Sequence, residues 1–159
     1  MAHPDLPRGL MPSLKDRLLD PNSMGTRGQP GYTMQQIVDS VRDDLEDLLN
    51  SRRSHRSLEA EYPELARSIF TYGLPDLASV DTSTAGSRDE IGKLIEATIG
   101  VHEPRLRKVR AMQTRSRALD LRAMFHVDAE LHADPAPAVL FETVVELTTG
   151  HASIRERTD

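Results

Sequence analysis

Apolar residues recur every three or four positions from Met34 to Leu49, with acidic and basic side chains between them. The apolar positions are Met34, Ile37, Val38, Val41, Leu45, Leu48 and Leu49. This spacing predicts an amphipathic helix with one buried face and an acidic outer face. Thr33 precedes the run and is the expected N-cap. Basic residues between Arg52 and Arg56 follow the C-terminal end, where positive charge suits the helix dipole.

A second helical run lies further along the chain, beyond a stretch without a long period. Within that stretch, Gly73 and Pro75 predict a turn. The core positions expected there are Leu65, Ile69 and Phe70. Ser87 and Glu90 then have the spacing of a capping box. The helix that follows places four apolar residues on one face, namely Ile91, Leu94, Ile95 and Ile99. Gly100 is the expected terminator of this helix.

The period changes from about 3.6 to 2 after Pro104. In LDLRAMFHVDAEL, residues 119–131, the odd positions are all apolar and the even positions are mostly polar. This alternation predicts a strand with one buried face. Residues 138–149, AVLFETVVELTT, alternate in the same way except at Val144 and predict the next strand. A shorter candidate strand, RLRKVRAM at 105–112, precedes both.

Together these elements predict an α+β domain over residues 32–150, in which two amphipathic helices pack on a small antiparallel β-meander of about three strands. Residues 151–159 are expected to form a polar C-terminal tail. Residues 1–31 are rich in Pro and Gly and cannot build a core of their own. They contain PSLKDRLLDP, which predicts a short helix near 13–20 with Ser13 as its cap. Its leucine face either packs back on the domain or docks on a partner.

The composition excludes several classes of protein but does not identify an activity. The 159 residues are 38% hydrophobic and 28% charged, which suits one domain of ordinary size. The formal net charge of −5 argues against a general nucleic-acid binder. Because the chain has no Cys, neither a disulfide framework nor a thiolate metal site is expected. No apolar run has signal-peptide or membrane-span length, so we expect a soluble protein of a reducing compartment without membrane insertion.

Motifs of known chemistry are largely missing from the sequence. It contains no phosphate-binding loop with a following Lys-Ser/Thr, no HExxH pair and no nucleophile–base arrangement. His126 and His132 lie six residues apart on one predicted strand face, where a solvated face is the expected explanation. We therefore predict no metal ligand, no cofactor and no catalytic residue.

Glu103, Pro104 and Arg105 follow the second helix and admit three interpretations. A Glu at a helix end can serve as a glycosidase acid, but Arg105 favours the charged carboxylate whereas an acid catalyst must hold its proton. The chain also has no Trp to form a sugar platform. Pro104 biases Glu103 away from helical geometry, which predicts a helix-to-strand hinge. An ionic pair at a rigid corner also suits docking, and the residues alone do not choose between structure and docking.

Several segments taken together resemble the TssE baseplate subunits of type VI secretion systems, which belong to the phage baseplate-wedge family once labelled lysozyme-like. The matching segments are SLKDRLLD, SVRDDLEDLLNSRR, YPEL, FTYGLPDL, EIGKLIEATIGVHEPRLRKV and FETVVEL. They run from Ser13 to Leu147 in family order. The most specific of the motifs are YGLPD and EPRL.

This resemblance implies a non-catalytic structural role in a contractile injection machine. Proteins of the family bind the core bundle of the baseplate wedge, formed by TssF and TssG, and meet the first ring of contractile sheath proteins. The family signature carries over to Glu103, Pro104 and Arg105 as the contact with that bundle. A sheath segment would also add a strand to the sheet. The implied place is cytoplasmic, within a membrane-docked baseplate. A wedge protein of a phage tail or phage-like particle is the alternative, and a peptidoglycan hydrolase is the least supported.

Overall fold

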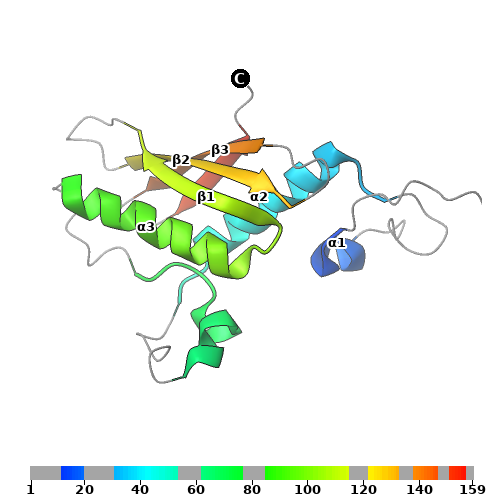
Figure 1. The fold of residues 1–159 in the computed structure, drawn as a ribbon, viewed down its shortest axis with the longest axis horizontal. Helices are drawn as coiled ribbons and strands as arrows, with labels where there is room; N and C mark the ends of the chain where they lie inside the picture. The colour runs from blue at the N-terminus through cyan, green and yellow to red at the C-terminus, as the bar shows by residue number, and fades with distance from the viewer. Residues whose placement is uncertain are drawn as a thin grey trace, which may run out of the picture. The chain divides into compact units, whose positions relative to one another are not determined.

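The computed structural model describes residues 12–19, 31–53, 62–76, 85–114, 122–132, 138–146 and 151–156. The chain divides into two compact units, residues 1–43 and 44–159. This division falls within one helix, α2 (Met34–Asn50), so each unit is described in turn. Figure 1 shows the elements of both units in chain order.

The first unit contains the short helix α1 (Leu14–Leu19) and the N-terminal part of α2. Ser13 and Asp16 cap α1 reciprocally, because the Asp16 N–H donates to Ser13 Oγ at 3.1 Å and the Ser13 N–H donates to Asp16 Oδ2 at 3.0 Å. The Ser40 hydroxyl of α2 also donates to Asp16 Oδ2, at 2.6 Å. The three exposed leucines of α1 are Leu14, Leu18 and Leu19. The predicted helix and its cap are confirmed, and a polar bond rather than the leucine face joins α1 to α2.

Helix α2 begins where the sequence pattern predicted. The Thr33 N–H donates to Gln36 Oε1 at 2.8 Å, and the Gln36 N–H donates to Thr33 Oγ1 at 3.3 Å. This reciprocal pair satisfies two backbone N–H groups at the start of the helix, which have no acceptor within the helix. The buried apolar residues of the helix are Ile37, Val38, Val41, Leu45, Leu48 and Leu49. Thr33 is therefore the cap, and the predicted buried face is confirmed.

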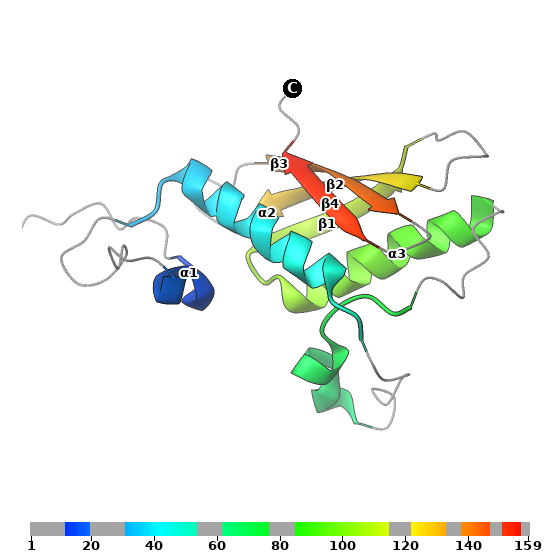
Figure 2. The same cartoon turned by 180° about the vertical axis from the view of Figure 1, so that it is seen from behind.

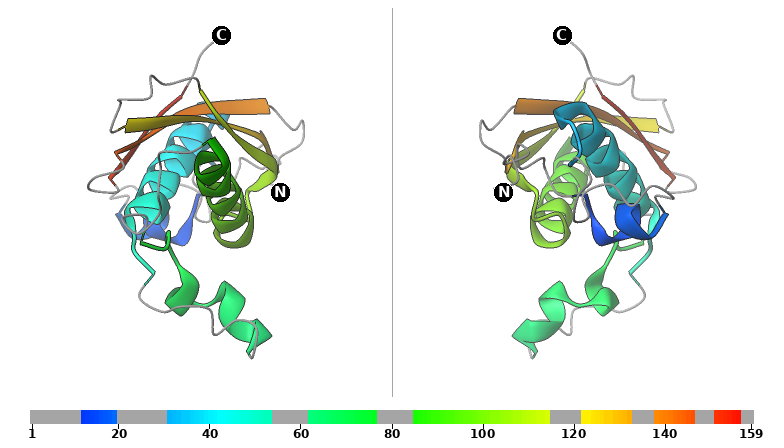
Figure 3. Two further views of the ribbon diagram at one scale, coloured as in Figure 1. Left: turned by 90° about the vertical axis from the view of Figure 1, so that its left-hand side faces the viewer. Right: turned by 90° about the vertical axis from the view of Figure 1, so that its right-hand side faces the viewer.

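The second unit is built on a four-stranded antiparallel sheet in which neighbours in sequence are neighbours in space. Its strands are β1 (Leu106–Gln113), β2 (Arg122–Leu131), β3 (Ala138–Glu146) and β4 (Ala152–Glu156). Helix α3 (Ala85–His102) and the C-terminal half of α2 lie on the same face of this sheet (Figures 1 and 3). The predicted α+β meander is thus confirmed.

The core lies between this face of the sheet and the two helices. Every second residue of β2 and β3 is buried, as the alternation predicted. The buried strand residues include Phe125, Val127, Leu131, Phe141, Thr143 and Val145. The helices contribute Leu45, Leu49, Ile91, Ile95 and Ile99. Each large apolar side chain buried in this way stabilises the fold by about 1.5–3 kcal/mol. Leu119, Leu121 and Leu147, also predicted to be inward, lie outside the described residues.

The sheet has one strand more than predicted, because residues 152–156 form β4 rather than part of a polar tail. Ala152 and Ile154 are buried, and Ser153 between them is half-buried. Two inward residues followed by charged ones are too few to reveal a period of two in the sequence. The strand is defined instead by its pairing with β3, and Figure 2 shows β4 as the outer strand of the sheet.

Two predictions about the ends of α3 were wrong, namely Ser87 as its cap and Gly100 as its terminator. The helix begins at Ala85, so Ser87 lies within its first turn instead of capping it. It also continues through Gly100, where an added Cβ would meet no atom within 4 Å. Glycine lowers helix stability by only about 1 kcal/mol. Pro104, in contrast, sterically restricts the residue before it, so the helix ends at His102. The predicted role of Pro104 as a helix stop is confirmed.

Residues 62–76 form two short 3₁₀ helices, η1 (Pro63–Arg67) and η2 (Ile69–Thr71). The prediction that Ile69 and Phe70 belong to the core is wrong, since they are 85% and 57% exposed. The two 3₁₀ helices have only 5 and 3 residues, so they leave no repeating pattern in the sequence that marks a buried side. The buried residues of this segment are Thr71, Gly73 and Leu74, and Leu65 is half-buried.

Candidate functional site: an ionic corner and two sheet edges

The chain turns from α3 into β1 within three residues. The Glu103 N–H still donates to the Ile99 carbonyl at 2.8 Å, and the Leu106 N–H donates to the Glu103 carbonyl at 3.1 Å. Pro104, at the apex, is exposed. The predicted hinge therefore exists as a tight corner closed by backbone hydrogen bonds on both sides.

Arg105 binds two carboxylates at this corner. Its Nε donates to Glu103 Oε1 at 2.8 Å, and its Nη2 donates to Glu103 Oε2 at 2.7 Å. The same Nη2 donates to Asp44 Oδ2 of α2 at 2.6 Å. A planar guanidinium suits such a two-pronged contact, which fixes geometry as well as charge. Residues 44, 103 and 105 thus form an ionic triad that joins the corner to the C-terminal half of α2.

Glu103 is almost wholly buried, at 5% exposure. This carboxylate therefore does not lie at the surface, although Pro104 and part of Arg105 do reach it. Burial by itself lowers the pKa of Arg105, but the hydrogen bonds and charges of Glu103 and then Asp44 outweigh it and raise that pKa above its ordinary value. With both oxygens of Glu103 engaged by Arg105, the geometry is that of a structural carboxylate and not of an exposed acid catalyst.

The YGLPD motif forms backbone hydrogen bonds with the residues that follow α2. Gly73 has a φ of +100°, and a Cβ there would lie 2.4 Å from the Ser51 carbonyl oxygen. The Leu74 N–H donates to Ser51 O at 3.0 Å, and the Arg53 N–H donates to Leu74 O at 3.0 Å. Only glycine tolerates this backbone angle and this close approach without strain. Two of the segments that suggested the family, LLNSRR and YGLPD, therefore contact each other.

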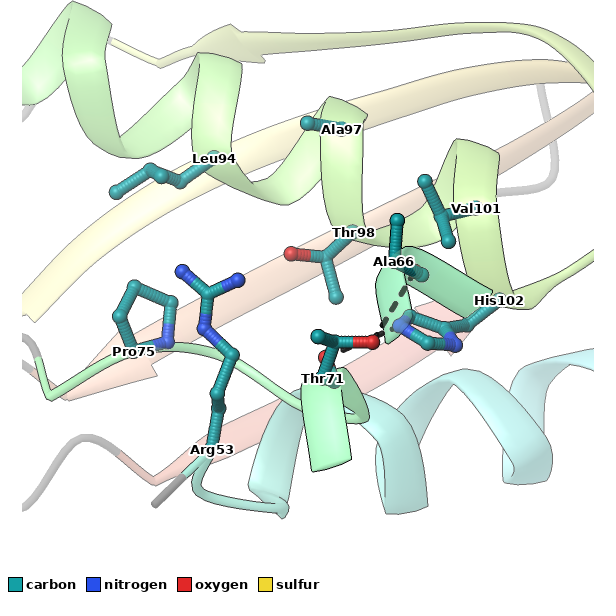
Figure 4. Close-up of a pocket in the computed structure, with 9 residues that line it drawn as sticks. All are labelled: Arg53, Ala66, Thr71, Pro75, Leu94, Ala97, Thr98, Val101 and His102. Atoms are coloured by element: carbon teal, nitrogen blue, oxygen red, sulfur yellow. Dashed lines mark hydrogen bonds between the residues drawn. The ribbon is translucent and has the colours of Figure 1, made fainter. Parts of the chain in front are cut away.

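A cavity of about 170 Å³ lies between α3 and the segments on either side of η2 (Figure 4). Leu94, Ala97 and Val101 line one wall, and Arg53 and Pro75 lie across from Leu94. A histidine at the helix end, His102, has its Nε2 3.0 Å from the Thr71 carbonyl oxygen. Of the hydroxyls in its lining, that of Thr71 donates to the Leu65 carbonyl at 2.9 Å.

The described residues hold no group of three His, Cys, Asp or Glu side chains that could bind a metal ion. His126 lies on β2, and His132, just beyond the end of β2, contacts Arg107. Within the same ranges, no helix combines the length and apolar composition of a membrane span.

The two outer strands of the sheet differ in what lies against them. On β1, the Ala111 N–H donates to Glu96 Oε1 of α3 at 2.8 Å. On β4, the Ala152 N–H donates to Asn50 Oδ1 at 2.8 Å, and Asn50 Nδ2 donates to the Ala152 carbonyl at 2.9 Å. Each outer strand therefore has a side chain bonded to its backbone, from a helix in both cases.

Sequence reasoning found the corner but missed the side chains that complete these contacts. Asp44 was assigned to a solvated acidic face, yet it lies three residues after Val41 and four before Leu48, at the border of the buried stripe. This spacing could have indicated from the sequence that the Asp44 side chain lies beside the core and contacts another element. Glu96 and Asn50 occupy ordinary polar positions of their helices, and nothing in their local sequence marks them.

The model of a known protein family matches the part of this chain that contains most of these features. Residues 35–136 match the family model of the baseplate wedge protein gp25. The fold is accordingly that of a structural wedge protein of a baseplate, and the chain belongs to the baseplate wedge protein gp25 family. The match includes the corner, the YGLPD motif and strands β1 and β2. The predicted resemblance to the baseplate-wedge family is confirmed.

Among solved structures, the chain is similar to one from a structure titled "The baseplate complex from the type VI secretion system". The two are 16% identical, with a TM-score of 0.49 over 79% of this chain and 97% of that chain. No curated protein matches the chain.

Proposed function

We propose that this protein is a non-catalytic component of a type VI secretion baseplate that joins the core bundle of the wedge to the first ring of the contractile sheath. Family membership supports the structural role in a baseplate. The observation that carries the joining role is an open four-stranded sheet, which ends in β4 on one side and keeps its described helices on a single face. An open sheet edge can accept a strand from another chain.

The secretion-system form of this proposal rests on the resemblance of YGLPDL and LLNSRR to TssE proteins. In that setting the wedge bundle consists of TssF and TssG, and the protein acts in the cytoplasm within a membrane-docked baseplate. A wedge protein of a phage tail or phage-like particle would share the fold and differ in its partners.

Affinity purification of the full chain from its native host separates these settings. We expect wedge subunits and sheath proteins of a secretion system to co-purify. Recovery of phage-tail proteins instead would favour the alternative. If neither set is enriched over an unrelated bait, the proposed assembly role is refuted.

At the corner, the surface offered to the core bundle consists of Pro104 and the exposed part of Arg105, while Glu103 holds Arg105 in place. Pro104→Ser leaves the ionic triad intact and should weaken co-purification with TssF and TssG without changing the circular dichroism spectrum. Arg110→Ala, at an exposed position on β1, is the matched control and should have no effect. Unchanged wedge assembly by Pro104→Ser would remove the docking role from this corner.

The absence of catalysis is tested directly with purified full-length protein and peptidoglycan. We expect no release of soluble fragments, because Glu103 is buried against Arg105. Turnover that disappears in Glu103→Gln would instead establish a hydrolase.

A further inference from the structure

Helix α3 carries a second apolar stripe besides the one that packs on the sheet. Leu94, Ala97 and Val101, with Thr98 between them, have the spacing of one helix face. None of the four is fully buried, and Ala97 and Val101 are exposed, Val101 at 43%. The stripe forms one wall of the cavity of about 170 Å³ beside η2 (Figure 4). Apolar side chains that line an open hollow, unlike isolated ones, mark a site for another molecule.

The cavity has the volume and the walls that an aromatic ring requires. A cavity of about 150 Å³ lined by apolar side chains holds one benzene molecule. Here Leu94, Ala97 and Val101 form the apolar wall, and Arg53 and Pro75 lie across from Leu94 (Figure 4). A guanidinium attracts the face of an aromatic ring by a cation–π interaction, which an aliphatic side chain cannot gain. The walls therefore favour an aromatic side chain.

A hydroxyl in the lining gives the ring a direction. The other polar groups at this end of the cavity are engaged, since the Thr71 hydroxyl donates to the Leu65 carbonyl and His102 Nε2 contacts the Thr71 carbonyl oxygen. The Thr98 hydroxyl, in contrast, forms no hydrogen bond with any residue that the structure describes. Figure 4 shows it directed toward the side of the cavity where Arg53 lies. A hydroxyl both donates and accepts, so it can pair with a phenolic hydroxyl.

From these features we infer that the cavity beside η2 is a binding site for a tyrosine side chain of another protein. The ring lies between Leu94 and the Arg53 guanidinium, and its hydroxyl pairs with that of Thr98. The site continues toward the corner, because the lining residue His102 is only two positions before the exposed Pro104. The inference rests on the proposed function for the source of the tyrosine, which is a wedge subunit that docks at the corner.

Binding of p-cresol, the side-chain analogue of tyrosine, tests the site in the free, full-length protein without any partner. We expect saturable chemical-shift changes at the methyl groups of Leu94 and Val101, with a Kd on the order of 1 mM. The methyl groups of Ile154, on β4, should not shift. Toluene has the same ring without the hydroxyl and should bind more weakly. If p-cresol gives no saturable shift at Leu94 and Val101, the inference is overturned, whatever the partner.

Two substitutions separate the contributions of the ring and the hydroxyl. Thr98→Val keeps the shape of the side chain, so p-cresol should bind about three- to tenfold more weakly while toluene binding stays unchanged. Arg53→Met removes the cation and should weaken the binding of both compounds about two- to fivefold. Lys93→Ala, exposed on α3 outside the lining, is the matched control and should alter neither. An unchanged preference for p-cresol in Thr98→Val would refute tyrosine as the occupant.

Cysteine labelling tests the source of the tyrosine. The chain has no Cys, so a single introduced cysteine is unambiguous. Ala97→Cys, at the exposed rim, should react with a maleimide in the free protein and lose this reactivity in the wedge complex purified from the native host. Lys93→Cys should react equally in both. Equal reactivity of Ala97→Cys in both would refute a wedge subunit as the source. If p-cresol binds but no wedge complex forms, the proposed function fails and the tyrosine site stands.

Discussion

The two outer strands of one sheet are protected in different ways. β1 follows α3 directly through the corner, and the helix lies alongside the strand, with Glu96 and Gly92 against Ala111 (Figure 1). β4 relies on Asn50, which lies 102 residues earlier in the chain and bonds to Ala152 alone. The contact on β1 thus comes from the helix that precedes the strand in sequence, whereas the contact on β4 comes from a residue far away along the chain.

This difference shows two ways in which a small open sheet can occupy backbone groups of its outer strands. An edge that is closed by a helix resists any added strand. The predictions that follow alter the cover of β1 or the corner that positions it, and each leaves the Asn50–Ala152 bonds as an internal reference.

The largest effect is expected from Gly92→Leu. The new Cβ would lie 3.0 Å from the Ala111 oxygen, and the remaining side chain would meet the ring of Phe125, so α3 must move away from β1. Overpacking of this kind costs about 3 kcal/mol. Thermal unfolding should report the loss, and light scattering should report new association through the opened edge.

Gly100→Ala in the same helix is the control for this substitution. Its Cβ meets no atom within 4 Å, so helix propensity alone should raise the stability by about 0.5–1 kcal/mol. Equal destabilisation by both substitutions would mean that close packing of α3 on β1 is not the cause.

Removing the ionic triad at the corner is expected to have the next largest effect. Arg105→Met leaves Glu103 buried without its partner, and breaking such a pair costs about 3–5 kcal/mol when it is fully buried. Because Arg105 is partly exposed, we expect about 2 kcal/mol by denaturant unfolding.

The double substitution Glu103→Leu with Arg105→Met should recover part of that loss, since it leaves no unpaired buried charge. Failure to recover would point to the geometry of the corner instead of its charge. Because the pKa of Arg105 is raised, its contribution is present below its ordinary pKa and is lost only when the pH rises through the still higher folded value. The titration of Arg105 therefore adds no pH dependence near neutrality.

Glu96→Leu should have a smaller effect, confined to the edge of β1. It removes the acceptor of the Ala111 N–H, which costs about 1 kcal/mol and should speed exchange of that amide by about tenfold. Glu96→Gln keeps an acceptor oxygen and should restore protection. If exchange at Ala111 stays slow in Glu96→Leu, the helix backbone rather than the carboxylate protects this edge.

The smallest effect is expected where the pairing of β1 with β2 shifts register, between Arg107 and Arg110. Lys108→Gly relieves a positive φ of 53° but removes an exposed ion pair with Glu130 at 2.8 Å. Exposed pairs contribute little, so we expect a net gain of about 0.5 kcal/mol in a thermal melt. A loss of stability would show that the ion pair outweighs the backbone strain.

The elements of this fold were predictable wherever local spacing encodes them. Thr33 and the stripe to Leu49 defined α2, the alternation around Phe125 defined β2, and Pro104 defined the end of α3. β4 was missed because it is short, and Ile69 and Phe70 were misplaced because a 3₁₀ helix of 3 residues leaves no repeating pattern that marks its buried side.

By itself, the sequence determined the α+β class, the helix-to-strand corner and the family, because caps, periods and motifs depend on residues a few positions apart. Only the tertiary structure decided which side chains meet at the corner and at the edges. Asp44 reaches Arg105 across 61 residues, and Asn50 reaches Ala152 across 102. No local pattern encodes such pairs, since they form only when packing of the apolar faces brings distant polar residues together. The same packing makes Glu103 a buried partner of Arg105.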